Sequence, residues 1–451
     1  MKSLDRLLFT HIDNSALVVF RVIFGLLITV EAWGAIATGW VRKTFVEPQF
    51  TFNFIGLDFL QSFPGTGVQM YAYFAIMGVF GLGVMLGYKY RWSILGYGIM
   101  WSGVYLMQKS SYNNHYYLLM LLCGVMALFP AQHRFSIDAY KNPSRYRNSM
   151  PRWVVLLIIA QLWIVYTYAS LAKLYPDWLD ATVPQLLMRG RAYYWGIGDV
   201  LQERWVHYTI SYVGIIFDGL IIPMLLWKKT RKWAFIVSIF FHLFNSIIFQ
   251  IGIFPYMSLA FTLFFFEPKT IHRIFLSRWK PFYDKANVFV PKYKQLGIAL
   301  IGVYLITQIA LPLRHWALPD DVLWTEEGHR LSWRMMLRSK SGSLLMFTQN
   351  KATGKREIVV LSDYLTKKQL RNIRTKPDMI WQFAQRLKKE YAAKGQDIAV
   401  YAKARVRVNG RKLHLLTDES VDLASTPWYY FGHSPWLLDS GDYLDKQPKV
   451  D

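Results

Sequence analysis

Residues 153–172 read WVVLLIIAQLWIVYTYASLA and contain no Asp, Glu, Lys or Arg. A helix of about 20 apolar residues crosses the ~30 Å hydrocarbon core of a bilayer. Similar apolar stretches lie near residues 14–38, 68–88, 92–108, 115–131, 206–227, 233–251, 254–266 and 295–313. With 53% hydrophobic and 17% aromatic residues, the composition is too apolar for a soluble chain of this size. We expect a polytopic α-helical membrane protein with about nine transmembrane helices.

Basic residues gather in alternate loops, at residues 89–91, 134–152, 228–232 and 269–294. Because cytoplasmic loops carry an excess of Lys and Arg, these four loops are expected inside the cell. A cytoplasmic N-terminus followed by nine crossings satisfies all four. The net charge of +23 then reflects topology and contact with anionic membrane lipid, and it does not indicate nucleic-acid binding.

The chain changes character after His315. Alternating patterns predict strands at residues 343–349, 356–362, 397–408 and 411–417, and helical patterns predict helices at 367–374 and 377–394. Asn409-Gly410 is typical of a type I′ hairpin turn. The sequence therefore predicts a transmembrane domain at residues 1–314 and an extracytoplasmic α+β domain at residues 315–451. We expect the second domain to pack on the outer ends of the helices.

Several polar side chains are predicted at or just below the outer membrane face. Lys173 follows the fifth span, His115 opens the fourth, His315 closes the ninth, and His242 lies ten residues into the seventh. Polar groups are costly at such depth and typical of functional sites. A lysine at a helix end more often snorkels to the interface. Apolar neighbours on both sides of Lys173, however, would desolvate its amine and favour the neutral form that acts as a general base.

Purely structural roles remain open for several polar residues. His115 could hydrogen-bond loop carbonyls, and His242 could bond to Asn245 one turn away. Arg21 and Asp218 are predicted at similar depth, and we expect them to form a structural ion pair because each alone would be costly. A lone cysteine and the absence of metal-binding motifs argue against a metal centre.

Four segments resemble vitamin K-dependent γ-glutamyl carboxylases. Residues 111–118, SYNNHYYL, are similar to an Asn-Asn-His-x-Tyr-Leu segment of that family, and residues 169–178, ASLAKLYPDW, resemble the segment that carries its base lysine. Residues 241–256 and 311–336 resemble two further segments, and all four occur in family order. The chain resembles a bacterial relative of the horizontally transferred transmembrane type.

The resemblance implies a carboxylating lyase that couples epoxidation of reduced vitamin K by O2 to proton removal from a protein glutamate and addition of CO2. It implies a glutamate-containing protein or peptide as substrate and no metal. Lys173 would be the general base, and His115, oriented by Asn114, would stabilise negative charge. Contacts to reduced vitamin K would come from Asn113, His242, Asn245 and His315. The glutamate substrate would meet Trp324, His329, Ser332, Trp333, Arg334 and Arg338.

Two other functions remain open. A quinone epoxidase or oxidoreductase would keep the Lys173 chemistry without carboxylating a peptide. A transporter or lipid-binding membrane protein should show inverted hydropathy repeats, and the sequence has no convincing internal repeat. As an integral protein of a bacterial inner membrane, the chain would expose its C-terminal domain to the periplasm or the cell exterior.

The predicted orientation is testable by cysteine labelling in intact cells. Thr353→Cys should react with a membrane-impermeant maleimide, because residues after 315 lie outside the cytoplasm in this topology. Thr230→Cys should react only after the membrane is permeabilised. Labelling at position 230 but not at 353 would reverse the orientation.

Overall fold

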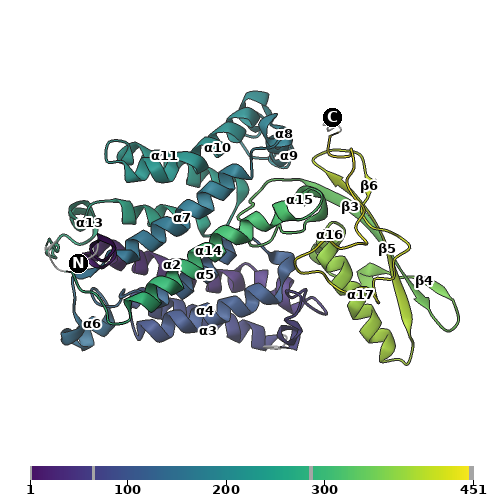
Figure 1. Ribbon diagram of the computed structural model, residues 1–451, viewed down its shortest axis with the longest axis horizontal. Helices are drawn as coiled ribbons and strands as arrows, with labels where there is room; N and C mark the ends of the chain where they lie inside the picture. Colours follow the sequence, from purple (N-terminus) through teal and green to yellow (C-terminus); the bar gives the residue numbers. More distant parts are fainter. Residues whose placement is uncertain (1–2, 63–66, 284–287, 446–451) are drawn as a thin grey trace.

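The computed structural model describes residues 3–62, 67–283 and 288–445. A bundle of apolar helices forms one body, and an α+β domain covers one of its ends (Figure 1). Helix α1 (Ser3–Phe9) lies toward the opposite end. Lys285, which belongs to the basic loop predicted at 269–294, and residues 446–451 of the predicted C-terminal domain lie outside the described residues.

Within the described chain, apolar helices lie where the sequence predicts them. They are α2 (Ser15–Ala37), α3 (Val68–Leu86), α4 (Tyr90–Met107), α5 (Asn114–Leu128), α7 (Trp153–Leu171), α10 (Arg204–Leu226), α11 (Arg231–Phe244), α12 (Phe254–Phe261) and α14 (Lys294–Leu313). Six segments are long and apolar enough to cross a membrane: α2, α3, α7, α10, Arg231–Phe249 and Lys294–Ala317. α5 and α12 are shorter. The chain is therefore an integral membrane protein, while the number of nine crossings stays a prediction.

Shorter elements connect these helices. The helices are α6 (Ile137–Lys141), α8 (Pro176–Leu179), α9 (Thr182–Arg189), α13 (Pro268–Phe275) and α15 (Val322–Thr325). Strands β1 (His11–Asp13) and β2 (Ser149–Pro151) pair antiparallel. A π-helical turn at Asn245–Phe249 continues α11. It ends at Gln250, whose φ of 52° is left-handed, so the chain turns there before α12 begins.

Glycines allow α2 and α3 to approach each other closely. A Cβ atom on Gly25 would lie 2.3 Å from the backbone nitrogen of Met85, and one on Gly81 would lie 2.7 Å from Thr29 Oγ1. Neither position has room for a side chain. Small residues at a helix interface increase van der Waals contact, which drives helix association in lipid where the hydrophobic effect does not.

The C-terminal domain is a four-stranded antiparallel sheet with two helices. The strand order is β4 (Arg356–Ile358), β3 (Lys340–Asn350), β5 (Ile398–Val408) and β6 (His414–Leu415), and the helices are α16 (Lys367–Ile373) and α17 (Pro377–Ala392). Asn409 and Gly410 have φ values of 49° and 81°, and Arg411 N donates to Val408 O at 3.1 Å. The predicted type I′ turn is thereby confirmed.

Two strands are shorter than the sequence predicts. β4 ends at Ile358 because the chain turns into a 3₁₀ segment at Leu361–Asp363. β6 begins only at His414, because residues 411–413 that follow the turn are not paired with β5. Alternation of apolar and polar residues predicts an extended chain, but it does not say how much of that chain is hydrogen-bonded.

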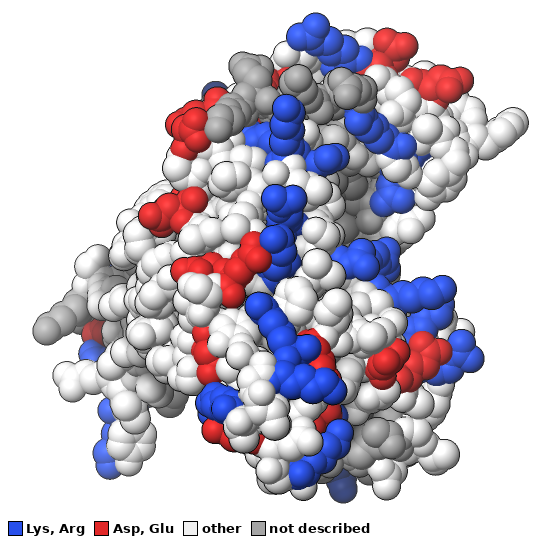
Figure 2. Space-filling model, turned by 90° about the vertical axis from the view of Figure 1, so that its right-hand side faces the viewer, with Lys and Arg blue, Asp and Glu red and all other residues white. Residues whose placement is uncertain are grey.

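The core of the C-terminal domain also contains residues from the first loop of the helical region. Phe50 and Phe52 pack in the same cluster as Ile380, Phe383 and Val400. The boundary at residues 314/315 thus stays a prediction. Figure 2 faces this end of the molecule, where Lys and Arg side chains run down the middle of the surface with Asp and Glu on both sides.

A buried ion pair fastens the domain to the bundle. Arg411 donates from Nη1 to Asp177 Oδ2 at 2.5 Å and from Nη2 to Oδ1 at 2.8 Å, and Asn409 Nδ2 donates to the same carboxylate at 2.8 Å. A second pair joins Lys109 Nζ to Asp378 Oδ2 at 3.1 Å. The prediction that the domain packs on the helix ends is confirmed by these contacts.

Replacing Arg411 with Ala should loosen this attachment. Asp177 would be left buried without its bidentate partner, and removing one member of a buried pair typically costs about 3–5 kcal/mol. We expect a lower melting temperature and faster proteolysis between the bundle and the domain. Arg405→Ala removes an exposed arginine from β5 and should change neither. Equal behaviour of the two variants would contradict the role given to the Asp177–Arg411 pair.

Candidate active site

A cavity of about 350 Å³ lies between α7, α10, α11 and the beginning of α12. Lys173, Asp218, His115 and His242 face it, together with the polar side chains of Asn245 and Thr209. The remaining wall is mostly apolar and includes Tyr166, Trp178, Ile210, Val213, Val237, Phe240, Phe241, Phe244, Phe249, Ile251, Phe254, Met335 and Met336. The three spans that supply Lys173, His115 and His242 thus converge as their sequence depth predicts, and Asp218 is an addition.

Lys173 lies in the turn between α7 and α8, and its side chain runs back along the last turn of α7. Pro176 opens α8 and holds the preceding Tyr175 extended, at φ −144° and ψ 158°, which ends α7 here. The Lys173 Nζ donates to Ala169 O at 2.8 Å and to Asp218 Oδ2 at 2.5 Å. Lys173 is only 8% exposed, so its amine does not snorkel to the surface.

Reciprocal contacts with α10 fix the position of this turn. Trp178 Nε1 donates to Ser211 O at 3.1 Å, and Ser211 Oγ donates back to Trp178 O at 2.5 Å. Lower down, Ser170 Oγ donates to Ile215 O at 3.0 Å. Because α7 and α10 are joined above and below Lys173, Asp218 on α10 is held facing the amine.

The expected ion pair between Arg21 and Asp218 does not form. Asp218 pairs with Lys173, whereas Arg21 is fully buried beside Gly87 and donates from Nη2 to Phe135 O. Counting residues from the membrane surface gives depth but not the direction in which a helix face points. The count also missed that the Lys173 side chain turns back into the bundle and reaches Asp218.

The two histidines approach the cavity in different ways. The His115 ring stacks on Phe254, with the ring centres 3.9 Å apart. His242 Nε2 hydrogen-bonds to the hydroxyl of Tyr166 at 3.2 Å and not to Asn245, which lines the cavity separately. Among the described residues, nothing hydrogen-bonds to the buried His242 Nδ1. A buried polar atom without a partner is rare in a folded protein.

The two asparagines before His115 have other partners. Asn113 caps α5, because its side-chain oxygen accepts from Tyr116 N at 2.7 Å. Asn114 donates to Arg334 O at 2.8 Å and accepts from the Tyr112 hydroxyl at 2.7 Å. The expectation that Asn114 orients His115 is therefore wrong in this arrangement. Asn114 instead ties the cavity to the loop that follows α15.

Two known protein families match parts of this chain. Residues 9–269 match the HTTM domain, and residues 293–442 match the lumenal domain of vitamin K-dependent gamma-carboxylase. The chain belongs to the vitamin K-dependent gamma-carboxylase family. No solved structure matches it.

The family resemblance assigned substrate contacts to the loop after α15, and this loop separates two cavities. Met335 and Met336 face the Lys173 cavity. Ser332, Arg334 and His315 face a neighbouring cavity of about 400 Å³, where Arg334 Nη1 lies 3.3 Å from His315 Nε2. His315 therefore does not line the Lys173 cavity, because η8 (Arg314–Ala317) carries it to the other side of the loop.

Other residues expected at a glutamate entrance line neither cavity. Trp324 is fully buried in the C-terminal core, where its Nε1 donates to Leu438 O at 2.7 Å. Trp333 stacks on Tyr117 inside the helical core, with the ring centres 4.9 Å apart. Arg338 pairs with Glu326 and lies 3.2 Å from His329 Nε2. Large aromatic side chains in this loop thus hold the two domains together.

A buried basic cluster surrounds Glu326 behind this loop. Burial alone would raise the pKa of Glu326, but the charges of Arg338, Lys340 and Lys376 outweigh it and lower that pKa. Burial lowers the pKa of Lys340 to about 8 and that of Lys376 to about 7. Glu326 therefore stays ionised among these basic groups. In the described part of the chain, no group of His, Cys, Asp and Glu side chains could hold a metal ion.

Sequence reasoning missed part of the cavity wall. Tyr166 and Trp178 contact His242 and Lys173, but Tyr166 stood in an ordinary apolar helix, and Trp178 was given no role although it ends the segment that resembles the family. Met335 and Met336 stood in a segment resembling the family, and left-handed residues at Leu331, Trp333 and Met336 turn the loop that carries them to the cavity. No sequence pattern predicts that turn. Asp218 carried a signal, as an acid inside a span, but the wrong partner was assigned.

Proposed function

We propose that this protein carboxylates glutamate side chains of a protein or peptide in a reaction driven by reduced vitamin K. The observation that carries the proposal is the buried Lys173–Asp218 pair in an apolar cavity, beneath a C-terminal domain of the lumenal type. A base at the membrane boundary can react with a lipid-soluble reductant, and a domain that covers the base can bind a protein substrate.

The polarity of the Lys173 cavity and its opening to the side support binding of reduced vitamin K. Val213, Val237 and Phe240 line the cavity and are 45%, 47% and 71% exposed on the outside of the bundle. The cavity is thus accessible from the side, between α10 and α11, where an isoprenoid tail would remain in lipid. Lys173 and His242 would face the polar ring atoms. When bound, the hydroquinone reacts with O2 and supplies the strong base that removes the glutamate γ-proton.

Lys173 and Asp218 act together in this proposal. In this proposal Nζ is neutral when the hydroquinone binds and receives its proton, and the positive charge that then develops on Nζ is balanced by the Asp218 carboxylate 2.5 Å away. An aspartate stabilises the imidazolium of serine proteases in the same way. The apolar wall excludes water, which would otherwise quench a strong base.

His115 and the loop after α15 have separate roles in the second half of the reaction, which is the carboxylation of glutamate. The His115 ring lies on Phe254 at the cavity and is placed to donate to developing negative charge. Arg334 in the neighbouring cavity is the better partner for a glutamate carboxylate, because Arg338 is already paired with Glu326. The glutamate carboxylate would be held by Arg334 on one side of residues 332–336, and its γ-carbon would reach past the edge of this loop to the base that forms in the Lys173 cavity on the other side.

The proposal includes location and topology. Nine crossings with a cytoplasmic N-terminus put the C-terminal domain on the periplasmic or outer face of a bacterial inner membrane. A quinone epoxidase without peptide carboxylation is the second candidate, because the Lys173 cavity alone would suffice for it. Measuring vitamin K epoxide and fixed CO2 separately distinguishes the two functions.

Substitutions of the Lys173–Asp218 pair test the base. Lys173→Ala should abolish both epoxide formation and CO2 fixation, and a small exogenous amine should restore part of both at high pH. Lys173→Arg should stay inactive, because a guanidinium remains protonated. Asp218→Asn removes the balancing charge and should slow epoxide formation on the order of 10²-fold. Lys229→Ala, an exposed lysine in the loop before α11, is the matched control. Normal epoxidation by Lys173→Ala would remove lysine from the reaction.

His115→Ala tests the division of labour. Loss of a positioned donor typically lowers a rate on the order of 10²–10³-fold, and we expect CO2 fixation to fall more than epoxide formation. His207→Ala is the control, because His207 is buried and bonds to Leu201 O at 3.0 Å away from the cavity. It should lower the melting temperature and both activities in parallel. If His115→Ala also lowered the melting temperature and both activities in parallel, His115 would have only a structural role.

A further inference from the structure

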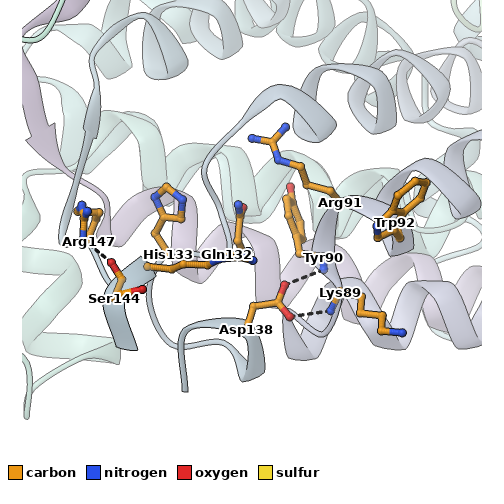
Figure 3. Close-up of a pocket in the computed structure, with 10 residues that line it drawn as sticks. Lys89, Tyr90, Arg91, Trp92, Gln132, His133, Asp138, Ser144 and Arg147 are labelled. Atoms are coloured by element: carbon orange, nitrogen blue, oxygen red, sulfur yellow. Dashed lines mark hydrogen bonds between the residues drawn. The ribbon is translucent and has the colours of Figure 1, made fainter. Parts of the chain in front are cut away.

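A third cavity, of about 950 Å³, lies at the end of the bundle away from the C-terminal domain. It is formed where α4 begins and by the chain between α5 and β2 (Figure 3). Four basic side chains line it: Lys89, Arg91, Arg145 and Arg147. We refer to this site as the basic cavity. It shares no lining residue with the Lys173 cavity.

The one acid in the wall does not neutralise these charges. Asp138 accepts from Lys89 N at 2.8 Å through Oδ1 and from Tyr90 N at 2.9 Å through Oδ2. Its carboxylate therefore caps the first turn of α4, as Figure 3 shows. Among the described residues, no carboxylate lies within ion-pair distance of any of the four basic side chains.

Two of the arginines are held in place by main-chain carbonyls. Arg91 Nη1 donates to Ala127 O at the end of α5 at 2.5 Å. Arg147 Nη1 donates to Ser144 O at 2.9 Å and to Tyr146 O at 2.7 Å. Each guanidinium keeps further N–H groups for another acceptor. The cations are thus partly preorganised before any anion binds.

The pKa of His133 is affected by the charge inside the basic cavity. Its pKa is lowered by burial and then by the positive charges of Arg147, Arg91 and Arg145. Three guanidinium groups from two segments, the start of α4 and the loop before β2, therefore act on one point in the wall. Such convergence matches an anion with several oxygen atoms, and phosphate is the anion for which bidentate arginine contacts are typical.

The surroundings favour a lipid as the source of that phosphate. Trp92 lines the basic cavity and is 74% exposed, and Leu95 and Ile99 continue an exposed apolar stripe along α4. A tryptophan beside basic residues is typical of the membrane interface. We propose that the basic cavity binds the phosphate headgroup of an anionic membrane lipid, with the acyl chains along Trp92, Leu95 and Ile99.

Binding of a fluorescent phosphatidylglycerol to the purified full chain in nonionic detergent tests the proposal. Phosphatidylglycerol should bind at least about tenfold more tightly than phosphatidylcholine, which has no net charge. Arg91→Gln with Arg145→Gln should weaken phosphatidylglycerol binding about 10- to 30-fold, since each basic residue contributes on its own. Arg145→Gln alone should weaken it several-fold. Arg145 is exposed and its side chain has no hydrogen bond within the described chain, so this variant should keep the native melting temperature.

The matched control is Lys269→Gln with Arg273→Gln on α13, which removes the same charge from exposed positions outside the cavity. It should leave binding nearly unchanged. Equal weakening in both double variants would mean diffuse attraction and would overturn the proposal. Free glycerol 3-phosphate should not displace the lipid at equal concentration; displacement would assign the basic cavity to a soluble phosphate compound instead.

Discussion

The hydrogen bond between Lys173 and Asp218 is the constraint around which the helical region is organised. Either group alone would be costly to bury, so each requires the other. Meeting this requirement turns the Lys173 side chain inward and joins α7 to α10, with Ser170 and Trp178 bracing the contact. Four residues further on, Asp177 turns outward to Arg411. One short turn therefore positions the amine and also anchors the domain above it.

The loop after α15 completes the site from the other domain. Its backbone visits the left-handed region at Glu326, Gly328, Leu331, Trp333 and Met336, and such conformations persist only where the surroundings enforce them. Here Trp333 is buried among the helices and Arg338 is paired to Glu326. This loop is a fixed wall with an apolar side toward Lys173 and a basic side toward Arg334. A hydrophobic reductant and an anionic side chain require those opposite polarities.

The sequence predicts elements better than it predicts contacts. The apolar runs place the helices because burial of backbone polar groups in lipid leaves few alternatives to a helix, and Asn409-Gly410 places the hairpin through its local backbone preference. The grouping of Lys173, His115 and His242 also follows from depth along the spans. Depth does not determine the direction of a side chain, so the partners of Asp218 and Asn114 were assigned wrongly. Trp324 and His315 were misplaced because their positions depend on packing between segments far apart in the chain.

Phe50 and Phe52 lie in the core of the C-terminal domain although about 300 residues separate them from its sheet. That core is therefore incomplete until the loop after α2, made early in synthesis, meets strands made last. Until then Phe50 and Phe52 are not yet buried by the rest of that core. The two regions matched by separate family descriptions are consequently not interchangeable parts. Any exchange of the C-terminal domain between relatives has to carry a compatible first loop with it.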